Sequence, residues 1–177
     1  LRHQFSDGMW SAVSFTQMCP EEICVGPGRE RYDVAVTALT LWALLDSGLI
    51  QKNEVWEAAQ RALRWLKDRH DEGAVKTTYG KALCVIAFSR AFEKLGDPYS
   101  RAYAEEGIRE IERAQNRSGG WGYIAGDQQS DSSTTGWISL ALLSARETGV
   151  SSSPRTLVGA LRWFDTMTDE IYYRVSY

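Results

Sequence analysis

The feature that most constrains the fold is an alternation between two kinds of apolar segment, which occurs three times after Tyr32. Segments 34–46, 82–95 and 135–148 are apolar on nearly every side, as is typical of helices that are buried all round. After each of them comes an amphipathic segment, with apolar residues at three- and four-residue spacing and charged residues opposite. This alternation predicts an all-α fold that is built from pairs of helices.

Helix start and stop signals bound these segments. Each apolar segment ends at a glycine, the residue that most readily adopts the left-handed conformation after a last helical turn, at Gly48, Gly96 and Gly149. A polar residue precedes each amphipathic segment and is expected to cap its helix by accepting a backbone N–H. These caps are Asn53, Asp97 and Ser153, and the last two are followed by proline.

The segments pair into three helical hairpins, with expected bounds of about 32–75, 76–123 and 131–177. Their inner helices are buried on every side only if the hairpins stand side by side around a common centre, which predicts an α/α toroid, or an arc of one, in a single domain. Residues 1–31 are expected to form an N-terminal loop segment with a partial repeat. Three hairpins are few for a closed ring. The inner surface is therefore expected to meet the rest of a longer chain, a second copy in a homo-oligomer, or an apolar ligand.

Composition and charge exclude several classes of protein. The chain has 177 residues, of which 44% are hydrophobic, enough for one domain with a hydrophobic core. Its formal net charge of −3 argues against a nucleic-acid partner, because such proteins carry a basic surface. No stretch long enough to span a bilayer is free of charged residues, so no transmembrane segment is predicted.

Cysteine usage leaves the cellular compartment open. Cys19 and Cys24 share one loop, so an exported protein is expected to form a local disulfide between them, whereas a cytoplasmic one would keep both as thiols. Cys84 lies in an apolar run and is expected to pack as a small hydrophobe. A zinc site needs about four ligands, and only His3 and His70 are available to complete one, so neither a metal nor another cofactor is predicted.

One motif carries a resemblance to a known family. Gln115, Gly119 and Trp121 form a Gln-x-x-x-Gly-x-Trp pattern, with Gly120 inside it and Gly107 upstream. This pattern resembles the QW repeat of squalene and oxidosqualene cyclases and the related repeat of protein prenyltransferase β subunits. Over residues 5–177 the chain is most similar to bacterial proteins that contain prenyltransferase and squalene-oxidase repeats, a resemblance that implies an α/α toroid.

Weaker copies of the family elements accompany this motif. A partial copy stands at 7–10 and a decayed one at 71–75, while 33–38 and 131–136 both read Asp-x-x-x-Thr followed by a small residue and an aliphatic helix. The motif also has a structural interpretation. The glutamine can bond to a backbone at a helix end, the glycines permit a left-handed turn, and the tryptophan covers the junction between hairpins. A direct ligand role for Trp121 is the alternative.

The catalytic elements that the resemblance implies are missing. Class II triterpene cyclases donate a proton from an Asp-x-Asp-Asp-Thr-Ala motif, but Ser133 and Thr134 stand in place of its two adjacent aspartates. We therefore expect Asp33 and Asp131 to act as helix-start acids near the positive end of a helix dipole. The Asp-x-Cys pair that helps to bind zinc in protein prenyltransferases has no counterpart in the sequence.

Three functions follow from these observations. The first is a non-catalytic repeat module that acts as a scaffold or binds a protein or an apolar ligand. Its candidate ligand-binding residues are the aromatic ones on or near the inner helices, which could also be ordinary core: Tyr32, Trp42, Tyr79, Phe88 and Trp137. The second is a terpenoid-cyclase-like enzyme with Asp131 or Asp33 as an unorthodox acid. The third is a carbohydrate-active enzyme that uses Tyr123, Asp127 and Asp131.

Overall fold

The computed structural model describes residues 1–19, 25–169 and 174–175. Six α-helices account for most of this part of the chain, as the sequence predicted for an all-α protein. They are α1 (Asp33–Asp46), α2 (Asn53–Asp71), α3 (Thr78–Leu95), α4 (Pro98–Ala114), α5 (Ser132–Glu147) and α6 (Pro154–Met167). The shorter elements are the 3₁₀ helices η1 (Ser14–Met18) and η2 (Glu30–Tyr32) and the two-residue strands β1 (Thr168–Asp169) and β2 (Arg174–Val175), which pair antiparallel.

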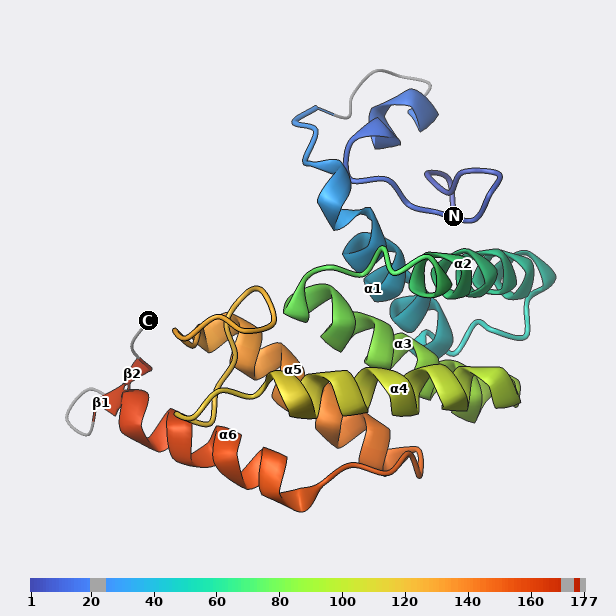
Figure 1. Ribbon diagram of the computed structural model, residues 1–177. Helices are drawn as coiled ribbons and strands as arrows, with labels where there is room; N and C mark the ends of the chain where they lie inside the picture. Colours follow the sequence, from blue (N-terminus) through green and yellow to red (C-terminus); the bar gives the residue numbers. More distant parts are fainter. Residues whose placement is uncertain (20–24, 170–173, 176–177) are drawn as a thin grey trace.

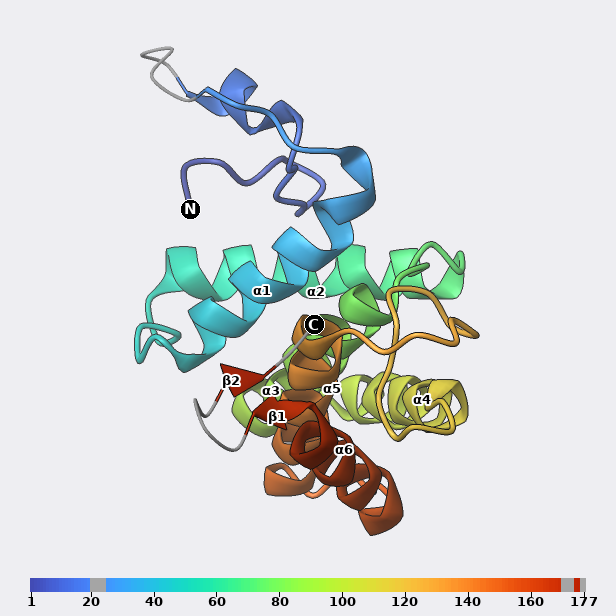
Figure 2. The same cartoon turned by 90° about the vertical axis from the view of Figure 1, so that its left-hand side faces the viewer.

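The helices are arranged as an inner row and an outer row. The middle inner helix, α3, packs against α1 on one side and α5 on the other, while α4 covers its outer side (Figures 1 and 2). On either side of this central pair, α1 packs against α2 and α5 against α6. The N-terminal segment lies over α1 and α2 (Figure 1). The inner helices thus form a row, and its continuation into a toroid stays a prediction.

Most of the expected helix boundaries are confirmed. Gly48, Gly96 and Gly149 have φ angles of 71°, 65° and 77° and follow the ends of α1, α3 and α5. Asp97 caps α4, because its side chain accepts the N–H of Ser100.

Two caps and one helix start differ from the prediction. Asn53 is the first residue of α2 and not its cap, which is Lys52, and no side chain caps this end. The start of α3 lies at Thr78, four residues earlier than the apolar run, because the Thr77 side chain accepts the N–H of Gly80. Ser153 has the cap position of α6 without a capping hydrogen bond from its side chain.

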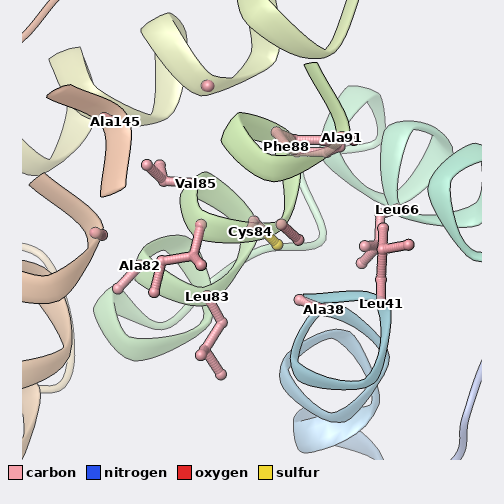
Figure 3. Close-up of a cluster of buried hydrophobic side chains, with 14 of the residues drawn as sticks. Ala38, Leu41, Leu66, Ala82, Leu83, Cys84, Val85, Phe88, Ala91 and Ala145 are labelled. Atoms are coloured by element: carbon pink, nitrogen blue, oxygen red, sulfur yellow. The ribbon is translucent and has the colours of Figure 1, made fainter. Parts of the chain in front are cut away.

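The core is centred on α3. Figure 3 shows side chains of α3 such as Leu83 and Phe88 amid neighbours from several helices, including Leu41 of α1, Leu66 of α2 and Ala145 of α5. Cys84 is buried here, as predicted, and burial raises the pKa of its thiol to about 12, so the thiol is protonated at neutral pH.

The expectation that all three inner helices are buried all round is wrong for α1 and α5. Leu39 of α1 is 39% exposed, and Leu140 and Leu143 of α5 are 38% and 42% exposed. The physical reason is their position in the row. Among the described elements α3 alone has an inner helix on both sides, whereas α1 and α5 each lack one neighbour. Their all-round apolar sequence therefore leaves apolar surface in contact with solvent.

An ion-pair cluster joins the inner helices near their C-terminal ends. Arg90 of α3 reaches Asp46 of α1, with 3.6 Å between Nε and Oδ2, and Glu147 of α5, with 3.0 Å between Nη2 and Oε2. Its Nη1 also lies 3.0 Å from Oε2 of Glu93 on its own helix. The side chain of Arg90 is only 21% exposed, so this cluster helps to fix the spacing of the row at the end away from the helix starts.

Candidate functional site

A groove of about 720 Å³ lies where the inner helices begin. Its walls are η2 with part of the N-terminal segment, the first half of α1, the start of α3, and the loop before α5 with the first turn of that helix. The lining is mostly apolar or aromatic: Ala12, Arg31, Tyr32, Ala35, Val36, Leu39, Thr77, Tyr79, Tyr123, Ile124 and Ser133. A volume of this size is typical of sites that bind small molecules.

Two of the five predicted aromatic residues line this groove, and two more belong to an aromatic cluster that begins at its wall. Tyr32 and Tyr79 line it directly. The ring of Trp137 stands edge-on to the ring of Tyr79 at 5.7 Å and to that of Trp42 at 6.5 Å, so aromatic side chains from α1, α3 and α5 form one cluster next to the groove. Burial raises the pKa of Tyr79, which keeps its hydroxyl protonated.

Phe88, the fifth predicted residue, lies elsewhere. Its ring is fully buried and stacks on Tyr103 of α4, with 5.1 Å between the ring centroids. Phe88 therefore faces the outer helix and belongs to the core (Figure 3). The face of α3 that carries Phe88 could not be inferred from the sequence, because this helix is apolar all round.

Arg31 is the one charged residue among the described residues that line the groove. Its guanidinium lies over the ring of Tyr32, 4.9 Å from the centroid, and its Nη2 donates to the Tyr32 hydroxyl at 2.8 Å. Both side chains are exposed, so Arg31 and Tyr32 form a polar rim beside an apolar interior.

Asp33 holds the N-terminal segment in place. Its Oδ1 accepts the backbone N–H of Ala12 at 2.6 Å, and the hydroxyl of Ser11 lies 3.4 Å from both carboxylate oxygens. Burial raises the pKa of Asp33 despite these hydrogen bonds. A raised pKa is what a proton donor requires, but Asp33 is not among the described residues that line the groove.

Asp131 caps α5. Its Oδ1 accepts the N–H of Thr134 at 2.7 Å and the hydroxyl of Ser133 at 2.5 Å. Burial acts to raise the pKa of this carboxyl, but the hydrogen bonds outweigh it and hold the pKa below its ordinary value. Asp131 is therefore ionised at neutral pH, which argues against its service as a general acid.

The trio considered for carbohydrate chemistry lines a second hollow, which shares Tyr123 with the groove. Tyr123, Asp127 and Asp131 help to line a depression of about 500 Å³ in the loop before α5. Asp127 stabilises this loop, because its Oδ2 accepts the N–H of Ile124 at 2.9 Å. Both carboxylates thus accept backbone N–H groups, and the lowered pKa of Asp131 removes one of the two acids as a proton donor.

The Gln-x-x-x-Gly-x-Trp motif makes its contacts with backbone atoms of neighbouring elements. The Gln115 amide donates to the oxygen of Gly119 at 2.7 Å and to that of Thr156, in the first turn of α6, at 2.8 Å. Trp121 is fully buried, and its indole donates to the oxygen of Ile111 at 2.8 Å. A side chain at Gly119 would overlap the backbone oxygen of Gly159 on α6. At Gly120 it would overlap Ser130.

A second complete motif, only half recognised in the sequence, lies at the N-terminus. Gln4 donates to the oxygen of Gly8 at 3.0 Å and to that of Ala58 on α2 at 2.8 Å, which reproduces the contacts of Gln115. The N–H of Trp10 donates to the hydroxyl of Thr37 at 2.9 Å, as Trp121 does to Thr135 at 3.1 Å. The partial copy recognised in the sequence at 7–10 does not include Gln4. The spacing of Gln4 from Gly8 and Trp10, which equals that of Gln115 from Gly119 and Trp121, is the signal that could have revealed the complete motif.

The remaining predicted site residues contribute little to this site. Cys24 lies outside the described residues, and with it the expected disulfide to Cys19. His3 packs against Phe15, whereas His70 packs against Tyr103. Within the described ranges, no three His, Cys, Asp or Glu side chains are placed to hold a metal ion. Among the same residues, no helix is both long and apolar enough to cross a bilayer.

No protein-family model, curated protein or solved structure matches this chain.

Proposed function

We propose that this protein is a non-catalytic α/α repeat module that binds an apolar ligand in the groove at the start of the inner helices. The single observation that carries this proposal is a cavity of about 720 Å³ whose lining is chiefly apolar and aromatic. Leu39, Tyr32 and Ile124 on its walls are all more than one third exposed. An apolar ligand would cover them and gain roughly 25 cal/mol for each Å² of apolar surface removed from water.

The state of the two aspartates supports a binding role over catalysis. Asp131 is held ionised as a helix cap, and Asp33 is engaged with the N-terminal segment. A cyclase-like reaction needs a protonated acid that faces the ligand, and neither residue meets both conditions. We further propose that the chain belongs to the family of squalene-cyclase and prenyltransferase repeats, on the support of the two motifs that begin at Gln4 and Gln115.

A fluorescence titration with 1-N-phenylnaphthylamine, an apolar dye that brightens in apolar surroundings, tests the binding proposal. Leu39→Lys places a charge on the groove wall, so we expect at least a tenfold loss of affinity, since a buried ion must be desolvated. Leu161→Lys on α6 is the matched control, because Leu161 is also exposed, at 56%, but does not line the groove. Equal losses in both variants, or no saturable binding by the wild type, would contradict the proposal.

The absence of catalysis is tested separately. Purified protein incubated with squalene or with farnesyl diphosphate should leave both compounds unchanged, as monitored by gas chromatography and mass spectrometry. A cyclised product that disappears in Asp33→Asn or Asp131→Asn would show that the module is an enzyme.

A further inference from the structure

The three junctions at which a preceding loop meets an outer helix, at α2, α4 and α6, are not equivalent. The sequence Arg69-x-x-x-Gly73-x-Val75, between α2 and α3, has the spacing of the two complete motifs. Side chains at Gly8 or Gly119 would overlap a backbone oxygen of α2 or α6, whereas one at Gly73 would meet nothing within 4 Å. The middle loop therefore stands away from its outer helix, α4, whereas the other two loops pack closely against α2 and α6.

The residues that seal the other junctions are also replaced. Arg69 does not reach α4 as the glutamines reach α2 and α6; its Nη2 lies 2.7 Å from Oε1 of Glu72. Val75 stands where Trp10 and Trp121 fill the other two junctions. Lys81 has the place of Thr37 and Thr135, because it follows the cap residue Thr77 by four positions. A small apolar residue and a charged one thus replace a large indole and a hydroxyl.

A polar pocket of about 520 Å³ occupies this middle junction. Gly73 and Val75 form part of its wall. Its lining includes His70 and the charged residues Asp71, Lys76, Lys81, Glu106 and Glu110, which come from the end of α2, the following loop, α3 and α4. The pocket is distinct from the apolar groove, because the two share no lining residue in the part of the chain that the structure describes.

Several of these charged side chains have a partner, whereas two of them form no ion pair with a described residue. Nζ of Lys81 lies 2.6 Å from Oε2 of Glu110, and the hydroxyl of Tyr103 donates to Oδ2 of Asp71 at 2.9 Å. Lys76 and Glu106 form no ion pair with any described residue. The pocket therefore presents one cation and one anion that remain available to a ligand.

We propose that this pocket binds a small zwitterion, a free α-amino acid, whose carboxylate pairs with Lys76 and whose ammonium group pairs with Glu106. A ligand with a single charge would satisfy one of these side chains and oppose the other. An α-amino acid carries both charges on adjacent atoms and fits a mainly polar cavity of this size. This inference does not depend on the apolar ligand of the groove.

Isothermal titration calorimetry with each of the common L-amino acids tests the proposal. At least one amino acid should bind, and Lys76→Gln and Glu106→Gln should each weaken it roughly tenfold, the usual effect of losing a hydrogen bond to a charged group. Lys52→Gln and Glu54→Gln are matched controls, because both residues are exposed at the start of α2 and neither lines the pocket. No binding up to about 10 mM, or the same affinity in all four variants, would overturn the proposal.

A second variant tests the structural origin of the pocket. Val75→Trp restores the residue that fills the other two junctions, so it should abolish amino-acid binding and leave the dye affinity of the apolar groove unchanged. Amino-acid binding that survives in a folded Val75→Trp protein would overturn the proposal. If this variant does not fold, the two charge variants decide the question.

Discussion

The motif at Gln115 makes a quantitative prediction about the junction between α4 and α6. Gln115→Ala removes the amide that donates at 2.7 Å to Gly119 and at 2.8 Å to Thr156. Each such bond contributes about 0.5–1.5 kcal/mol net, so the free energy of unfolding should fall by about 2 kcal/mol. The partner position is Gly159, where an added Cβ would lie 2.6 Å from Nε2 of Gln115.

This close approach predicts that the effect of Gly159→Ala on the free energy of unfolding has opposite signs in the presence and absence of Gln115. In the helix interior, alanine is better than glycine by about 1 kcal/mol. In the wild-type protein the new methyl group displaces the Gln115 amide, so the loss of about 2 kcal/mol exceeds the gain and the variant is about 1 kcal/mol less stable. In a Gln115→Ala background nothing is displaced, and Gly159→Ala should stabilise the protein by about 1 kcal/mol.

Urea denaturation of the four proteins at 25 °C measures this cycle, with a constant slope as the check for two-state unfolding. Gln128→Ala is the control, because Gln128 is exposed and its side-chain amide donates within its own loop, to the oxygen of Gly126. It should change stability by less than about 0.5 kcal/mol and add independently to Gly159→Ala. If Gly159→Ala has the same effect with and without Gln115, the glutamine does not join the hairpins as described.

Two further predictions concern stability. Gly8→Ala and Gly119→Ala should each lower the free energy of unfolding by several kcal/mol, because a Cβ there overlaps a backbone oxygen. Gly73 faces open space, so Gly73→Ala should cost only the strain of a positive φ, about 1 kcal/mol. Thermal unfolding of the three variants gives the order of stability, and an equal loss at Gly73 would contradict the open junction. Burial acts to raise the pKa of Asp97, but hydrogen bonds from Lys67 and Ser100 outweigh it and lower the pKa. The ionised carboxylate therefore stabilises the fold above the pKa of an unfolded aspartate, and this contribution is lost as the pH falls through the lowered pKa. In urea titrations from pH 7 to pH 2, the free energy of unfolding should decline less in Asp97→Asn than in the wild type, and parallel curves would refute the assignment.

Helix positions were predictable because local signals fix them. The glycines that end α1, α3 and α5, and the cap at Asp97, act within a few residues of themselves, so the sequence alone identifies them. Asn53 shows the limit of such signals, because a neighbouring residue can take the cap position while the helix stays the same.

The faces of the helices were not predictable, since they depend on the arrangement of the row. A helix that is apolar all round gives no periodicity from which to decide which side meets which neighbour. Leu39 and Leu140 therefore gave no sign of their exposure, nor Phe88 of its contact with α4. The groove was anticipated only through the aromatic residues at the helix starts. The middle pocket is present because Gly73 and Val75 are too small to fill the space between the loop and α4.

Photoaffinity labelling with an alkyl diazirine tests the central claim most directly, because it reports where an apolar molecule resides without assuming the ligand. Labelled peptides, identified by mass spectrometry, should come from the first half of α1 up to Leu39 and from the loop at Ile124, because both segments line the groove. Labelling confined to the exposed leucine of α6, Leu161, or spread evenly over the exposed apolar residues, would contradict the account.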